Sequence, residues 1–158
     1  MLSFSYSENA ICKCREHLTE TKTFSTEIET FLVHYLLVLI CSEFESRVLE
    51  ITLERVKKTG DSQVFSFVGN IIQRKFRRLR TGEMSELLKQ FDSELSDKFD
   101  KIVNNSPEQV SFNNIVNNRH DFAHGNKSIE MSFNDLESDF KKAKKIFEIY
   151  SSVLGIAS

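Results

Sequence analysis

Apolar residues recur at steps of three and four along most of this chain, the spacing that gathers them on one face of a helix. The clearest stripe spans 83–103 and contains Met84, Leu87, Leu88, Phe91, Leu95, Phe99 and Ile102. A second stripe near the end contains Phe133, Leu136, Phe140, Ala143, Phe147, Tyr150 and Leu154. No pair of segments has the alternating pattern typical of paired strands. The pattern therefore predicts an all-α fold.

Turn and capping residues divide this pattern into a bundle of about five or six helices, which we expect to form a single domain over 1–158. The predicted helices cover about 5–20, Ser25 or Thr26 to Lys58, 62–79, 83–103, Ser111 to His124, and Ser132 to Leu154. The breaks between them are predicted at Gly60-Asp61, Thr81-Gly82 and Asn104–Pro107, and Gly155 ends the last helix. The apolar run from Phe31 to Cys41 predicts that the second helix is long, central and buried.

Charge and composition narrow the possible partners. The formal net charge is −2, so any contact with RNA must come from a local basic patch and not from a globally basic protein. The three cysteines form no even set for a disulfide framework, which indicates a reducing compartment. The first residues lack the pattern of a targeting segment, and no apolar run is long enough to span a bilayer. We therefore expect a cytoplasmic protein with no membrane partner.

The stretch from Asn118 to Gly125 carries the most distinctive chemistry, because it places an arginine and two histidines at a predicted helix end. Arg119 is a fixed cation with a planar set of donors suited to phosphate, and His120 and His124 have side chains that titrate near neutral pH. These groups are the minimum set needed to cleave a phosphodiester without a metal. Histidines four residues apart can also bind a metal, but that site needs further ligands. We predict no metal and no cofactor.

A helical wheel places Arg119 inside the apolar arc of its own helix. That arc consists of Phe112, Ile115, Val116, Phe122 and Ala123. A buried guanidinium needs a partner, because leaving it unpaired costs several kcal/mol. Glu45 falls in the apolar arc of the long helix, so we predict that Glu45 holds Arg119, with Glu43 as second choice. A pair of this kind can also serve only to fix how two helices pack.

The run Arg119-His120-Asp121-Phe122-Ala123-His124 resembles the Arg-polar-x3-His motif of HEPN domains, the higher eukaryotes and prokaryotes nucleotide-binding group. The following Gly125 and the acidic cluster Ser42–Glu45 are similar to the RiboL-PSP branch and a MAE-like branch. The resemblance implies a helical bundle that dimerises and brings two copies of the motif into one cleft. It also implies a metal-independent endoribonuclease that acts as a toxin or phage-defence effector and is controlled by an antitoxin or other regulatory protein. Other members of the group are non-catalytic modules that bind a nucleotide or a partner protein.

RNA supplies its own nucleophile, the 2′-hydroxyl, so the expected products are a 2′,3′-cyclic phosphate and a 5′-hydroxyl end. His124 is the first choice for general acid or base. Arg119 is expected to bind the phosphate, and His120 to share the proton transfer or to position Arg119. Asn117 and Asn118 are expected to donate hydrogen bonds to RNA.

A dense basic cluster precedes the predicted break at Thr81-Gly82 and consists of Arg74, Lys75, Arg77, Arg78 and Arg80. This cluster is a candidate surface for the RNA backbone. The alternative interpretation is the solvated face of a helix. Three functions thus remain open: a homodimeric ribonuclease, a non-catalytic HEPN module, and a helical adaptor in which a glutamate–arginine pair is purely structural.

Overall fold

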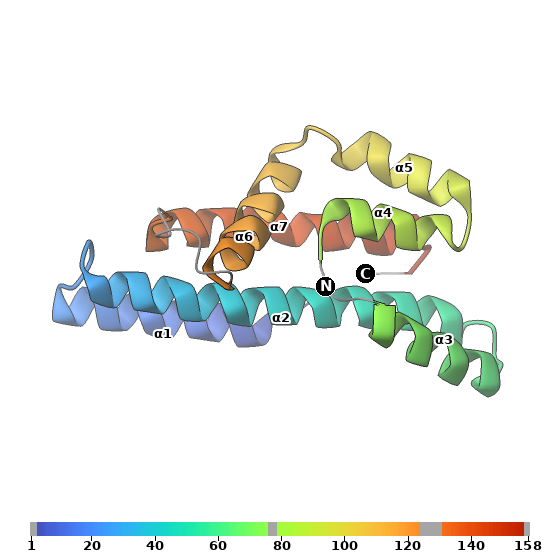
Figure 1. Cartoon of the computed structure of the whole chain (residues 1–158), viewed down its shortest axis with the longest axis horizontal. Helices are drawn as coiled ribbons and strands as arrows, with labels where there is room; N and C mark the ends of the chain where they lie inside the picture. The colour runs from blue at the N-terminus through green and yellow to red at the C-terminus, as the bar shows by residue number, and fades with distance from the viewer. Residues whose placement is uncertain (1–2, 76–78, 124–130, 157–158) are drawn as a thin grey trace.

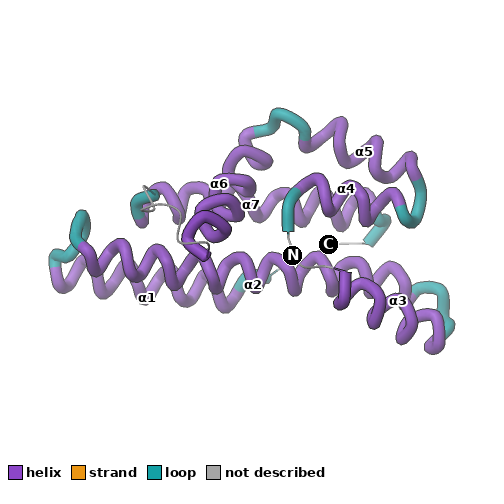
Figure 2. The backbone as a smooth tube through the Cα atoms, in the orientation of Figure 1, coloured by secondary structure: helices purple, strands orange, loops and turns teal. Residues whose placement is uncertain are grey.

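The computed structural model describes residues 3–75, 79–123 and 131–156, except for the side chains of Arg74 and Lys75. Within these ranges the chain forms seven helices and no strand (Figure 2). They are α1 (Ser5–Thr21), α2 (Glu27–Lys57), α3 (Ser62–Lys75), α4 (Thr81–Lys89), α5 (Ser93–Val103), α6 (Pro107–Ala123) and α7 (Phe133–Val153). The all-α prediction is confirmed, and the helix count exceeds the predicted five or six.

The helices form two groups that meet at α6 and also through direct contact between α2 and α7. Helices α1 and α2 run side by side, α3 folds back from the end of α2, and α4 and α5 form a hairpin beside α7 (Figure 1). Helix α6 crosses this arrangement steeply, and its C-terminal end comes down onto α2 (Figure 1). Because α6 contacts both α2 and α7, it connects the two groups.

Several helix ends lie where the sequence predicts them. The Thr26 side chain caps α2 by accepting a hydrogen bond from the Ile28 backbone N–H. Ser132 caps α7 in a capping box with Asp135. Gly60 follows α2 and has a positive φ of 74°, a conformation that glycine adopts without steric cost.

The prediction of one continuous helix over 83–103 is wrong, because the chain forms two helices there, α4 and α5. The break lies at Gln90–Asp92, and the Asp92 carboxylate begins α5 by accepting from the Glu94 backbone N–H at 2.9 Å. The apolar stripe continues through the break, so its spacing alone does not reveal the turn. The predicted break at Thr81-Gly82 is also wrong, since both residues belong to the first turn of α4.

The predicted start of α6 at Ser111 is wrong as well. The helix begins four residues earlier at Pro107, a residue whose fixed φ suits the first helical position. Ser106 caps this helix, because its side-chain oxygen accepts from the Gln109 backbone N–H at 3.1 Å. The Ser111 hydroxyl instead donates to Asp139 of α7 at 2.7 Å, which ties the two helices together.

A cluster of phenylalanine rings forms the centre of the core. The Phe44 ring on α2 lies 5.4 Å from Phe112 of α6 and 4.8 Å from Phe147 of α7, measured between ring centroids. Phe4 and Phe140 complete the cluster and also contact Phe44. All five side chains are buried. This cluster fixes α6 relative to α2 and α7.

The apolar run of α2 is not buried on all sides, contrary to the prediction. Its inner face is covered, but Phe31, Tyr35 and Val38 on the outer face have exposed fractions of 68%, 55% and 46%. The reason is that α1, α6 and α7 cover only one side of the helix. No helix in the described ranges combines the length and hydropathy needed to cross a membrane.

The phenylalanine cluster leads to a stability prediction. Replacing Phe44 with alanine should lower the free energy of unfolding by about 3–5 kcal/mol, because it removes a fully buried ring and leaves a cavity. Chemical denaturation followed by circular dichroism measures this change. The matched control is Phe67→Ala, whose ring is 67% exposed and whose loss should change stability by less than about 0.5 kcal/mol. Equal effects of the two substitutions would contradict the assignment of Phe44 to the core.

Candidate active site

The last two turns of α6 carry the motif arginine and are anchored by the core below them. Phe112 and Ile115 are fully buried, whereas Arg119 and His120 are half-buried. The Ser111 hydroxyl and the Asn114 amide both donate to the Asp139 carboxylate of α7, at 2.7 and 3.1 Å. These contacts hold one side of α6 against α7 and leave Arg119 on the side that approaches α2.

Arg119 and His120 line a small pocket with side chains from two other parts of the chain. Helix α2 contributes Cys41 and Glu45, the segment before α4 contributes Leu79 and Arg80, and α6 also contributes Val116. The cavity volume is about 30 Å³, which is room for a water molecule or two. The pocket thus gathers two guanidinium groups, an imidazole and a carboxylate around a space too small for a nucleotide.

The structure places Glu45, the first-choice partner, in the same pocket as Arg119. Burial raises the pKa of the Glu45 carboxyl, and the nearby positive charge of Arg119 lowers it by a smaller amount, so the net pKa is raised. Among the described residues, no ion pair within 4 Å links Arg119 to an acidic group. Glu45 and Arg119 therefore interact through their charges without a direct ion pair.

Glu43, the second choice, has a different role. Its carboxylate accepts a hydrogen bond from the Ser7 backbone N–H at 2.8 Å and lies 3.8 Å from the Arg47 guanidinium. The hydrogen bond from Ser7 ties the first turn of α1 to α2, and the contact with Arg47 lies within α2. Cys41, which does line the pocket, has its thiol pKa raised to about 12 by burial, so it remains protonated at neutral pH.

The remaining predicted residues divide into three groups. Arg80 of the basic cluster lines the pocket, a position that the motif spacing does not reveal. Asn117 is exposed and Asn118 donates to the Asn114 carbonyl at 2.8 Å, and neither lines the pocket. His124, Arg77 and Arg78, together with the side chains of Arg74 and Lys75, lie outside the described residues.

His34 of α2 also lies next to the motif helix α6, a position that was not predicted from the sequence. Its ring stacks on Phe122 of α6, with centroids 4.1 Å apart, and burial lowers the pKa of the imidazole. The His34 Nε2 atom is buried and has no hydrogen-bond partner. In the sequence, this position of His34 is marked by a histidine that interrupts the apolar run from Phe31 to Cys41.

The prediction that Phe122 and Ala123 are buried is wrong, since both are exposed at the end of α6.

The described residues contain no group of three or more histidine, cysteine, aspartate or glutamate side chains arranged to hold a metal ion. The polar groups of the pocket are instead suited to an anion. Two arginines can donate to phosphate oxygens, and the imidazole of His120 can transfer a proton.

Comparison with known protein families gives a match over most of the chain. The model of the family described as RiboL-PSP-HEPN matches residues 5–155, which is nearly the whole chain. Searches of curated proteins and of solved structures found no match.

The charge interaction in the pocket can be measured directly. Replacing Arg119 with glutamine removes the positive charge that lowers the Glu45 pKa, so this pKa should rise further above its ordinary value. A carbon-13 NMR titration of the side-chain carboxyl measures the shift. Arg55→Gln, on the same helix as Glu45 but outside this pocket, is the matched control and should leave the titration unchanged. An unchanged or lowered Glu45 pKa in the Arg119 variant would show that the two charges do not interact.

Proposed function

The chain belongs to the RiboL-PSP branch of the HEPN family, and we propose that it is a metal-independent endoribonuclease. The observation that carries this proposal is the pocket itself. Arg119 and His120 of the motif share it with Arg80 and Glu45, which come from distant parts of the sequence. Two cations beside an imidazole are suited to bind a phosphodiester and to move a proton near it.

The proposed reaction begins when a base removes the proton of the RNA 2′-hydroxyl. The 2′-oxygen then attacks the adjacent phosphorus, and the bond from phosphorus to the 5′-oxygen breaks as that oxygen takes up a proton. The products are a 2′,3′-cyclic phosphate and a 5′-hydroxyl end. His124 is the first choice for the acid or base, and His120 is the second. DNA lacks the 2′-hydroxyl and is not a substrate.

Arg119 and Arg80 would stabilise the negative charge that develops on the phosphate oxygens, because guanidinium groups donate several hydrogen bonds in a fixed plane. Glu45 acts through Arg119 as a positioning residue. Its negative charge lies near the guanidinium without a direct ion pair, so Arg119 keeps its donors available for phosphate. The half-buried position of Arg119 strengthens each of these interactions relative to water.

Because the pocket is too small for a nucleotide, we propose that RNA lies across its opening, with a second copy of the chain forming the other wall. An exposed apolar stripe on α2 is suited to that contact and consists of Ile28, Phe31, Tyr35 and Val38. The stripe is next to the motif helix, because His34 of α2 stacks on the exposed Phe122 of α6. We therefore propose a homodimer in which the two motifs share one cleft.

A toxin or phage-defence effector is the biological role that we propose for this activity, with a regulatory protein such as an antitoxin as a further partner. The family match supports a nuclease or nucleotide-binding module. A regulatory partner is part of the proposal because an RNA-cutting domain must be held inactive until it is needed. A non-catalytic module that binds a nucleotide or a protein is the competing function. The absence of any RNA cleavage would favour it.

Incubation of the purified chain with total RNA in EDTA tests the reaction. We expect cleavage without added metal, with cyclic phosphate and 5′-hydroxyl ends identified by end-specific ligation and mass spectrometry. Arg119→Ala and His124→Ala should each lower the rate by at least about 100-fold, the usual effect of losing a proton-transfer or charge-stabilising group.

The control variant is His17→Ala, which removes an exposed histidine of α1 and should retain the full rate. An RNA with 2′-O-methyl groups should resist cleavage. Products with 5′-phosphate ends, or variants that cut as fast as the original chain, would contradict the proposed chemistry.

The proposed dimer has its own test. Phe31→Glu places a charge in the apolar stripe of α2 and should convert dimers to monomers in sedimentation-velocity experiments, because burying an unpaired carboxylate is costly. Phe67→Glu is matched in exposure, at 67% against 68%, and lies on α3, so it should leave the dimer intact. A monomeric original chain, or dimers in both variants, would rule out this interface.

A further inference from the structure

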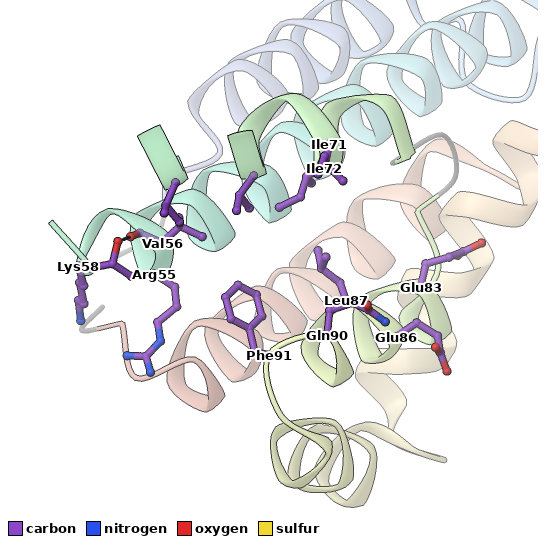
Figure 3. A pocket seen from close by; sticks show the side chains of 13 residues that line it. Arg55, Val56, Lys58, Ile71, Ile72, Glu83, Glu86, Leu87, Gln90 and Phe91 are labelled. Atoms are coloured by element: carbon purple, nitrogen blue, oxygen red, sulfur yellow. Dashed lines mark hydrogen bonds between the residues drawn. The ribbon is translucent and has the colours of Figure 1, made fainter. Parts of the chain in front are cut away.

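A large groove of the described structure is separate from the Arg119 pocket. It lies between α3 and α4 beside the C-terminal end of α2 and has a volume of about 910 Å³ (Figure 3). Its apolar wall consists of Val56, Val64, Val68, Ile71, Ile72, Leu87 and Phe91. The groove and the Arg119 pocket have no residue in common.

The basic and the acidic side chains of the groove lie at its opposite ends. Arg55 and Lys58 lie at one end and Glu83 and Glu86 at the other, with the apolar side chains between them (Figure 3). The Glu83 Oε2 atom is buried and has no hydrogen-bond partner. A buried carboxylate oxygen is costly to leave unpaired. Glu83 therefore brings to the acidic end of the groove a carboxylate that has one oxygen without a donor from the protein.

The dimensions of the groove correspond to about two turns of helix. The lining residues extend from Val64 to Ile72 on α3, a span of about 12 Å at 1.5 Å per residue, and from Glu83 on α4 to Phe91 in the turn that follows this helix. Phe67 stands on α3 one turn from Ile71 and is 67% exposed. The Phe67 ring therefore extends the apolar surface beyond the groove, whereas a small ligand would fill only the groove itself.

We propose that this groove binds one amphipathic helix of a partner protein. The apolar face of that helix packs between α3 and α4, as helices do in hydrophobic grooves. A basic side chain at one end of the helix pairs with Glu83 and Glu86, and an acidic side chain at the other end pairs with Arg55 and Lys58. The charge pattern thus selects a helix that is acidic at one end and basic at the other.

Stapled synthetic peptides of about eleven residues, long enough for the groove and held helical, are the probes for this site. Each carries leucine at every third or fourth position. One has glutamates at one end and lysines at the other, the second has glutamates at both ends, and the third has lysines at both ends. Binding is followed by NMR of the methyl groups of Val64, Val68, Ile71 and Leu87 in the full chain. The mixed peptide should bind at least about threefold more tightly than either uniform peptide.

A charge-reversal variant gives the decisive comparison. Glu83→Lys combined with Glu86→Lys makes both ends of the groove basic, so the preference should change to the peptide with glutamates at both ends. The matched control reverses two exposed acids of α5, Glu94→Lys and Asp97→Lys, and should retain the preference for the mixed peptide. Both variants are first compared with the original chain by their NMR spectra.

Three results would overturn the proposal. The first is a set of groove methyl signals that move with none of the peptides. The second is an unchanged peptide preference in the Glu83 and Glu86 variant. The third is tight binding of octanoate that excludes every peptide, since this would assign the groove to a small apolar ligand. None of these measurements depends on RNA cleavage.

Discussion

The stacking of Phe44 on Phe112 is the contact on which the candidate site depends. The two rings are 5.4 Å apart and nearly parallel, at an interplanar angle of 5°, and both are fully buried. Phe44 lies one residue before Glu45, and Phe112 lies about two turns before Arg119 on the same helix. A single apolar contact therefore sets the separation of two charged groups that make no direct ion pair. The hydrophobic core positions the polar site in this way.

The pocket brings together two positive charges that repel each other, and the surrounding fold holds them there. Arg80 and Arg119 are two cations with one partly buried carboxylate between the helices, so the local charge is positive although the whole chain has a formal net charge of −2. Burial raises the pKa of that carboxyl, and the nearby Arg119 charge lowers it by a smaller amount. An incoming phosphate would complete the charge balance, which agrees with the proposed substrate.

Local features of the sequence were predictable because they depend on neighbouring residues. Thr26 and Ser132 begin helices where capping rules place them, and the apolar stripe from Phe133 to Leu154 is buried throughout. The helical wheel also selected Glu45, which shares a pocket with Arg119, but the predicted ion pair between them is not among those formed by the described residues. The start of α6 was missed because Pro107 is typical both of a loop and of a first helical turn.

The other errors depend on contacts between distant residues. A continuous apolar stripe hid the turn between α4 and α5, and the run from Phe31 to Cys41 gave no sign that its neighbours cover only one side. The presence of Arg80 and His34 near the motif helix requires the chain to fold back over many residues. Periodicity along one helix carries no information about such pairings.

The first turn of α4 constrains how the chain can change in length. Its first residue, Thr81, is buried and accepts a hydrogen bond from the Gln109 side chain of α6 at 3.2 Å, directly after Arg80 has entered the pocket. One extra residue inserted after Thr81 would rotate Glu83 and Leu87 about the helix axis by about 100° relative to Arg80. The α4 side of the groove and the pocket residues directly before α4 would then lose their present relative orientation, so insertions at this position should be rare among functional relatives.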